Sequence, residues 1–312
     1  MNSLFLVGAF MTWFRPLSVL AAGLGAVVIL LVALALLLKL VFPKVAAIAR
    51  ATAKEAMSQP LFFIIMLFGA AALIIFPFIP YNTFGEDVKM LKDSGLTLII
   101  LLSLVLALWT ASVSVSEEIE GRTALTLLSK PVGRRQFIFG KLLGIVLPVA
   151  ILFLVLGTIF LGTISYKVVY DARETSNPEP TSAQCQYEML MTVPGLVLAF
   201  LEVVVLVSIS VAISTRLPML PNLIICFAIY ALGHLIPLLV ESSVGQFELV
   251  RFFGLLLTAV LPVLDHFNVS ASVATGQVVP WSYVGWAAVY AGLLTTAAVL
   301  LSLLLFEDRD LA

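Results

Sequence analysis

Residues 116–144 read SEEIEGRTALTLLSKPVGRRQFIFGKLLG, and in this stretch three carboxylates and five basic side chains lie between two long apolar runs. The rest of the chain is very different, because hydrophobic residues make up 62% of its 312 residues and charged residues only 11%. Its mean hydropathy is +1.15. A soluble domain is about half apolar and about a quarter charged. The composition therefore predicts a polytopic membrane protein, with the charged stretch at a membrane surface.

The charged stretch has the features of a short amphipathic helix that turns sharply into a membrane span. Ser116 can cap its start, and Glu117 and Glu118 occupy the first turn, where negative charge suits the helix dipole. Pro131 and Gly133 prevent the helix from continuing. Its apolar side consists of Ile119, Leu125, Leu127 and Leu128. Either lipid or a partner protein must cover that side.

Seven apolar runs are long enough to cross a bilayer, which takes about twenty residues of helix. They cover residues 17–41, 61–80, 96–115, 137–164, 193–213, 223–240 and 284–306. Open sheet edges are not stable in hydrocarbon, so each run is expected to be a helix. The predicted fold class is therefore an all-α polytopic membrane protein with about seven transmembrane helices.

The basic residues favour one orientation of these spans. With the charged stretch in the cytoplasm, ten lysines and arginines lie inside and six outside, as the positive-inside rule requires. The inside group is Lys44, Arg50, Lys54, Arg122, Lys130, Arg134, Arg135, Lys141, Arg216 and Arg309. This orientation places the C-terminal tail in the cytoplasm. The net charge of −1 gives no reason to expect a nucleic-acid partner.

Four segments between the spans have a predicted form. Residues 43–58 are basic and amphipathic, which predicts a helix along the inner membrane surface. Residues 81–95 and 166–188 are polar enough to be external loops. Residues 250–268 are short, apolar in the middle and broken by Pro262, which predicts a re-entrant or interfacial hairpin.

The charged stretch also resembles a known family. Its order of elements is an acidic pair, Glu-Gly, Thr, a leucine cluster, Pro-Val, a basic pair and then Gly-Lys. The residues in question are Glu117, Glu118, Glu120, Gly121, Thr123, Leu127, Leu128, Pro131, Val132, Arg134, Arg135, Gly140 and Lys141. This order resembles the segment between the second and third core helices of type-2 ABC transporter permeases. The chain departs from the usual six spans by one extra apolar run, within residues 1–42.

The resemblance implies a membrane subunit, over residues 43–312, that works with a separate ATPase. In it, 43–58 is an elbow helix, 117–131 is a coupling helix that docks on the ATPase, and 250–268 is an external hairpin. The residues implied in coupling are Glu117, Glu118, Glu120, Gly121, Arg122, Thr123, Leu125, Leu127, Leu128, Pro131, Arg134 and Arg135. The chain has no GxxxxGK[ST] phosphate loop, so ATP and Mg²⁺ are expected in the partner subunit and no cofactor in this chain. The family works as two permease chains with two ATPase subunits, commonly as an exporter in a bacterial plasma membrane.

Two other functions fit parts of the sequence. EEIEGR also matches an EExxxR pattern found in intramembrane proteases, but their companion histidine patterns are incomplete around His234 and His266. No HExxH zinc motif or GxSxG elbow occurs, so we expect neither catalysis nor a metal site. A membrane assembly factor that transports nothing is the third alternative.

Glu202 and His234 are ionisable residues that lie away from the ends of predicted spans. Glu202, in FLEVVVLVSIS, is expected to face a cavity or a partner helix, because an ionisable group at mid-depth is costly. His234, in YALGHLIP, is expected to hydrogen-bond between helices. We therefore place both on a substrate path or at a helix interface.

Overall fold

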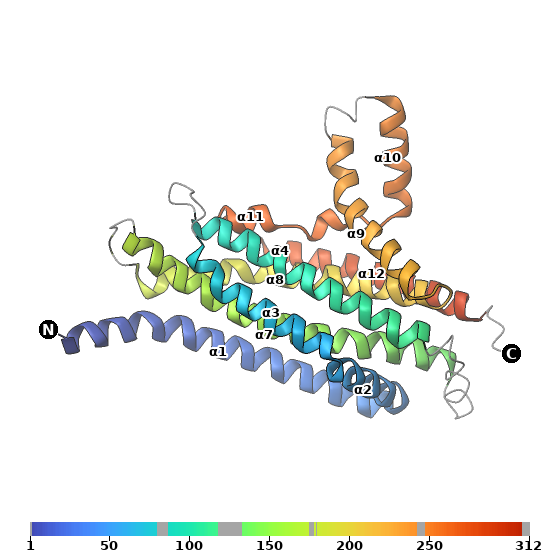
Figure 1. Ribbon diagram of the computed structural model, residues 1–312, viewed down its shortest axis with the longest axis horizontal. Coiled ribbons are helices and arrows are strands. Elements are labelled where there is room, and N and C mark those ends of the chain that lie inside the picture. The colour runs from blue at the N-terminus through green and yellow to red at the C-terminus, as the bar shows by residue number, and fades with distance from the viewer. Residues whose placement is uncertain are drawn as a thin grey trace.

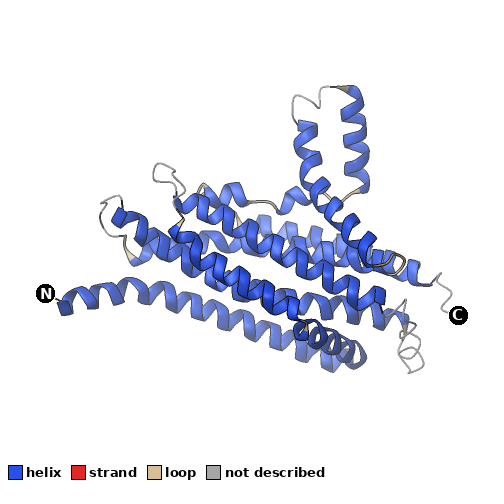
Figure 2. Cartoon of the chain, in the orientation of Figure 1, coloured by secondary structure: helices blue, strands red, loops and turns tan. Residues whose placement is uncertain are grey.

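A computed structural model describes residues 2–79, 87–117, 133–174, 178, 180–241 and 247–307. All regular elements in these ranges are helical (Figure 2). The longer helices are α1 (Asn2–Val41), α2 (Pro43–Ser58), α3 (Pro60–Ile75), α4 (Asp87–Ala111), α7 (Arg134–Glu174), α8 (Ser182–Ser214), α9 (Met219–Glu241), α10 (Glu248–Val260) and α12 (Trp281–Glu307). The short elements are η1 (Phe76–Phe78), η2 (Ser112–Glu117, a π-helix), η4 (Leu264–Phe267) and α11 (Ser270–Ala274).

The predicted membrane fold is confirmed. Seven helical segments in the described residues are long and apolar enough to span a bilayer. They are Arg15–Val41, Pro60–Phe78, Asp87–Val115, Arg134–Glu174, Ser182–Ser214, Met219–Pro237 and Trp281–Phe306. Each contains most or all of one of the seven apolar runs found in the sequence.

Successive spans run in alternating directions, roughly parallel to the long axis of the molecule (Figure 1). α2, the end of α4, the start of α7 and the last turn of α12 lie together at one end, which we name the α2 end. α11 and the starts of α4 and α8 lie at the other, the α11 end. The described basic residues at the α2 end include Lys44, Arg50, Lys54, Arg134, Arg135, Lys141 and Arg216.

The core of the bundle forms around α8, which packs against α1, α4, α7, α9 and α12. Its inner side chains, among them Leu198, Val203 and Leu206, are fully or almost fully buried. α1, in contrast, lies at the edge of the bundle (Figure 1), and none of the residues in its most apolar window are buried. One side of α1 packs on α2, α7 and α8, and the rest of its surface is left for lipid or a partner.

The amphipathic helix α2 packs directly on the start of α7. Gly140 and Gly144, one helical turn apart on α7, make this approach possible. A Cβ added at Gly144 would lie 2.6 Å from the Cβ of Thr52 and 2.8 Å from the carbonyl oxygen of Ala49. Small residues spaced in this way let two helix backbones come close in a membrane. The charged side chains Lys44, Arg50, Lys54 and Glu55 are exposed, as predicted.

Two predicted external loops are shorter than the sequence suggested. α4 begins at Asp87, α7 continues to Glu174 and α8 begins at Ser182, so most of 87–95 and 166–188 is helical. At the start of α8, Thr181 and Gln184 form a capping box in which each side chain accepts from the backbone N–H of the other. The T-x-x-Q pattern was the local signal for this helix start. The loop prediction for these helix ends is therefore wrong.

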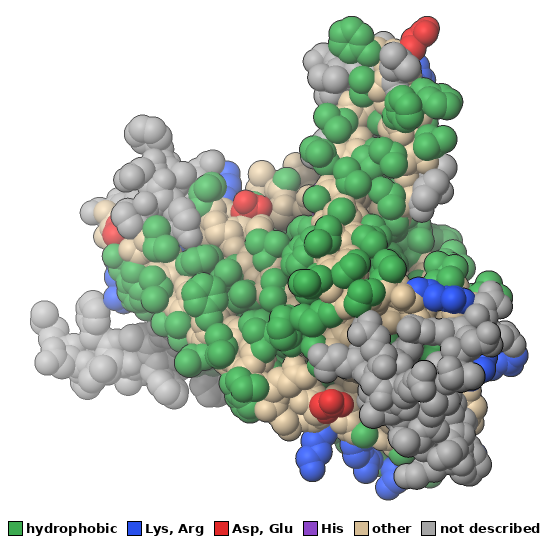
Figure 3. Space-filling view, turned by 45° about the vertical axis from the view of Figure 1, so that its right-hand side comes forward, with side chains coloured by type: hydrophobic (Ala, Val, Ile, Leu, Met, Phe, Trp, Pro, Cys, Tyr) green, Lys and Arg blue, Asp and Glu red, His purple; other side chains and the backbone are tan. Residues whose placement is uncertain are grey.

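The region around 250–268, predicted as a re-entrant or interfacial hairpin, contains the helix α10 and the short element η4. α10 is 13 residues long and is too short to be among the candidate spans. It packs beside the end of α9, and the pair projects away from the bundle (Figure 1). Hydrophobic side chains cover much of this projection (Figure 3), with Leu239, Phe247, Phe252, Phe253 and Leu255 exposed. η4 and α11 then lead back along the bundle to α12.

Candidate functional site

The predicted coupling segment joins α4 and α7 at the α2 end. Residues 118–132 lie outside the described residues, so Glu118, Glu120, Gly121, Arg122, Thr123, Leu125, Leu127, Leu128 and Pro131 stay as sequence-based predictions. Just before the coupling segment, Ser116 and Glu117 belong to the π-helix η2, which continues α4. The backbone of Ser116 is therefore already helical, and Ser116 is not the N-cap of a new helix. A π-turn inside a helix often marks a functional position.

Just after the coupling segment, the first residues of α7 contact the end of α12. The backbone N–H of Gly133 donates to Oε1 of Gln136 at the start of α7. The guanidinium of Arg134 lies 5.7 Å from the centre of the Phe306 ring, which stacks on Phe137. Arg135 is exposed. Arg134 thus links the start of α7 to the end of α12, and Arg135 is accessible to a partner or to lipid headgroups.

A buried polar cluster holds η2 to the bundle, and the sequence analysis missed it. The amide nitrogen of Asn222 on α9 lies 2.7–2.8 Å from the hydroxyl oxygens of Ser112, Ser210 and Ser214. All four side chains are buried. Ser112 is the first residue of η2, while the other two serines are one turn apart on α8. The cluster therefore joins three elements immediately before the coupling segment.

We expect Asn222→Ala to lower the free energy of unfolding in detergent micelles by about 1–3 kcal/mol, because three buried hydroxyl groups lose a partner. Ser208→Ala is the matched control, since Ser208 is equally buried but its hydroxyl donates to Val205 of its own helix. An Asn222 variant as stable as the Ser208 variant would show that the cluster does not hold η2 in place.

Glu202 and His234, which the sequence predicted separately, lie side by side. Oε1 of Glu202 on α8 is 3.4 Å from Nε2 of His234 on α9. The glutamate is 1% exposed and the histidine 22%. Both side chains therefore lie where α8 meets α9, and no signal in the sequence joined them.

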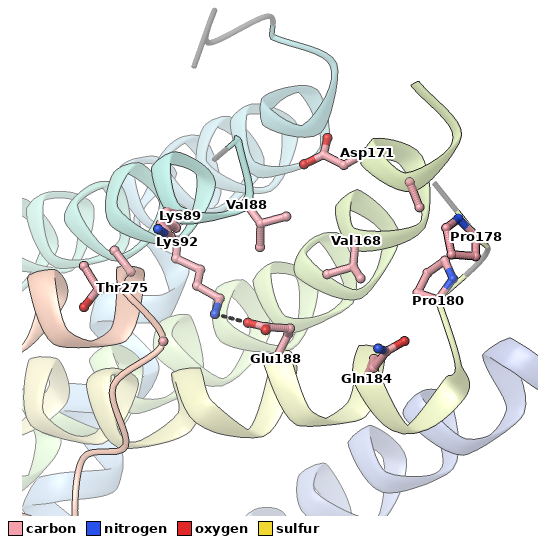
Figure 4. Close-up of a pocket in the computed structure, with 13 residues that line it drawn as sticks. Val88, Lys89, Lys92, Val168, Asp171, Pro178, Pro180, Gln184, Glu188 and Thr275 are labelled. Carbon is pink, nitrogen blue, oxygen red and sulfur yellow. Dashed lines mark hydrogen bonds and ion pairs between the residues drawn. The ribbon is translucent and has the colours of Figure 1, made fainter. Parts of the chain in front are cut away.

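A cavity of about 470 Å³ opens at the α11 end (Figure 4). Lys92 of α4 and Glu188 of α8 form an ion pair across its wall. The lining combines these charges with Lys89, Asp171, Gln184 and Thr275 and with the apolar Val88, Val168, Ala172, Pro178, Pro180 and Ala274. A cavity of this size and mixed lining can hold a small molecule that has both apolar and charged parts.

A second ion-pair group lies beside the cavity and ties α4 to α7. The ammonium group of Lys167 is 3.2 Å from Oδ2 of Asp87 and 3.0 Å from Oδ1 of Asp171. Lys167 is 2% exposed. Carboxylate oxygens of Asp87, Asp171 and Glu174 come within 4.8 Å of one another, a spacing that could hold a cation. Lys167 already balances the charge of two of these carboxylates, Asp87 and Asp171, so they do not require a cation.

The sequence was also compared with known proteins. No protein-family model matches the chain, and no curated protein matches it. The functional assignment therefore depends on the charged segment and on the structure around it.

Proposed function

We propose that this chain is the membrane subunit of a type-2 ABC transporter, working as an exporter in a bacterial plasma membrane. The observation that carries the proposal is the place of the described helix ends on either side of the charged segment. The end of α4 and the start of α7 lie at the α2 end (Figure 1). The helix α2 itself carries the exposed basic residues Lys44, Arg50 and Lys54. In this proposal the α2 end faces the cytoplasm, in keeping with the positive-inside rule.

The arrangement around the segment suggests how force would reach the spans. An ATPase that grips 117–131 pulls on η2 at one end and on Arg134 at the other. η2 is joined through Asn222 to α8 and α9. α7 carries α2 with it, because the two helices are in close contact along the Gly140–Gly144 face. Closure of a dimeric ATPase would thereby move several spans together and alternate access to the two sides.

Substitution of both coupling leucines tests this function directly. We expect Leu127→Asp with Leu128→Asp to abolish co-purification of the proposed ATPase partner, while membrane insertion is unchanged. An apolar face docked in a protein groove cannot accommodate two buried carboxylates.

The matched control keeps the face apolar, with Leu127→Met and Leu128→Met, and should retain the ATPase. Full recovery of the ATPase with the doubly acidic variant would contradict the docking role. A chain that instead cleaves peptides and loses this activity in Glu118→Gln would support the protease alternative.

A further inference from the structure

Among the described residues, the helices that pack against α8 carry no lysine or arginine in their middle portions, where Glu202 lies. Basic residues on the helices that pack against α8 are near the helix ends, such as Lys92 and Lys167 at the α11 end and Lys141 at the α2 end. Residues 94–111 of α4, 142–165 of α7 and 16–38 of α1 contain no ionisable side chain. A carboxylate without a nearby cation is very costly in such surroundings.

The groups that face Glu202 come from two neighbouring elements. α9 contributes His234 and Tyr230, and η4 contributes Asp265, which is partly buried and of the same charge as Glu202. On α12, the hydroxyl of Tyr283 donates to the backbone oxygen of His266, and the hydroxyl of Tyr290 accepts from the backbone N–H of Val263. His234 is therefore the side chain available to compensate the charge of Glu202 among the described residues around it.

The hydrogen bonds of His234 fix where its protons must be. Nδ1 lies 3.1 Å from the backbone oxygen of Tyr230. A carbonyl oxygen can only accept, so Nδ1 carries a hydrogen. In a neutral imidazole Nε2 is then a bare acceptor, and it faces Oε1 of Glu202 at 3.4 Å. Oε1 is buried and has no hydrogen-bond partner among the described residues. With neither group protonated, a bare imidazole nitrogen would lie beside a buried carboxylate oxygen, which is unfavourable for both.

We propose that Glu202 and His234 together form a binding site for one proton inside the membrane-spanning bundle. The proton is carried either by Nε2, giving an imidazolium beside a carboxylate, or by the carboxyl group, which then donates to Nε2. Both forms have the same total charge. The site is independent of the transporter assignment, because it follows from the geometry of α8 and α9 alone.

The proton site lies where α9 leaves the bundle. Pro237 follows His234 by three residues inside the same helix, and prolines bend helices by removing a backbone hydrogen bond. Beyond it, α9 and α10 project outwards (Figure 1). With the proton bound, Glu202 holds the root of this projection against α8.

The chain has two histidines, which makes the proton directly observable. The full chain, labelled with ¹⁵N-histidine and held in lipid nanodiscs near neutral pH, gives two sets of imidazole resonances. His266 is exposed and serves as the internal reference, and His266→Gln assigns the signals. We expect either a protonated Nε2 at His234 or, in the infrared spectrum, the carbonyl band of a protonated carboxylic acid that Glu202→Gln removes and Asp265→Asn leaves in place.

The wild-type spectra decide the proposal even if a variant fails to fold. A bare Nε2 at His234 together with no carboxylic acid band near neutral pH would overturn it. In Glu202→Gln the amide donates to Nε2, so we expect His234 there to be neutral with a proton on Nδ1 only. An imidazolium at His234 in that variant would show that the histidine binds its proton without Glu202, which also contradicts a shared site.

Discussion

Replacement of Lys167 by methionine is expected to lower the free energy of unfolding by about 3 kcal/mol, the lower end for removal of one partner from a buried ion pair. Lys167 is 2% exposed and lies between Asp87 and Asp171, which are 16% and 17% exposed. Without the ammonium group, two largely buried carboxylates repel each other across the contact between α4 and α7. Chemical unfolding in mixed micelles measures the loss.

Two further variants make this result specific to the ion pairs. Lys54→Met removes an exposed lysine from α2 and should change stability by about 0.5 kcal/mol or less. The triple variant with Lys167→Met, Asp87→Asn and Asp171→Asn has no repulsion between these two carboxylates. We expect this variant to regain most of the lost free energy of unfolding. A Lys167 variant that is as stable as the Lys54 variant would mean that the acids are neutral or hydrated in the folded protein.

Gly144→Ala is expected to loosen α2 from α7. The new methyl group would meet a backbone oxygen of α2, which cannot move without shifting the helix. Overpacking of this kind costs about 1–3 kcal/mol. We expect a lower midpoint of thermal unfolding and faster proteolysis of the segment 43–58. In the proposed transporter, the same change should also weaken coupling to the ATPase.

Gly162 provides the matched control for this substitution. It lies on the same helix, but a Cβ added there would have no heavy atom within 4 Å. Gly162→Ala should therefore be neutral or stabilise α7 by up to about 1 kcal/mol through its helix propensity. Equal stability of the two alanine variants would contradict the close approach of α2 and α7.

The membrane class and the positions of the spans could be predicted from composition and run length. A long apolar run has one stable form in lipid, because only a helix satisfies its own backbone there. The helical form of 43–58 also followed from local pattern, since its charges alternate with small and apolar residues at helical spacing. The spans and the helical form of 43–58 depend on local sequence, so they can be predicted without knowing which segments pack against them.

The extent of the helices at the α11 end could not be predicted in the same way. Polar residues at 87–95 and 166–188 resemble loops when read along the chain. In the structure they are helical, and Lys92 pairs with Glu188, 96 positions away, while Lys167 pairs with Asp87, 80 positions away. Ion pairs between distant segments let charged residues remain in helices that pack together, and hydropathy along the chain carries no record of such pairs.

What the sequence determined by itself was therefore the number of spans, their helical form and a charged segment between two of them. Tertiary structure alone placed Glu202 beside His234, gathered Ser112, Ser210 and Ser214 around Asn222, and seated α2 on the glycines of α7. The physical reason is that some interactions act within one segment of the chain and others act between two distant segments. Hydrophobic burial in lipid acts on each segment separately, whereas a hydrogen bond, a shared proton or a close backbone contact exists only once two segments have met.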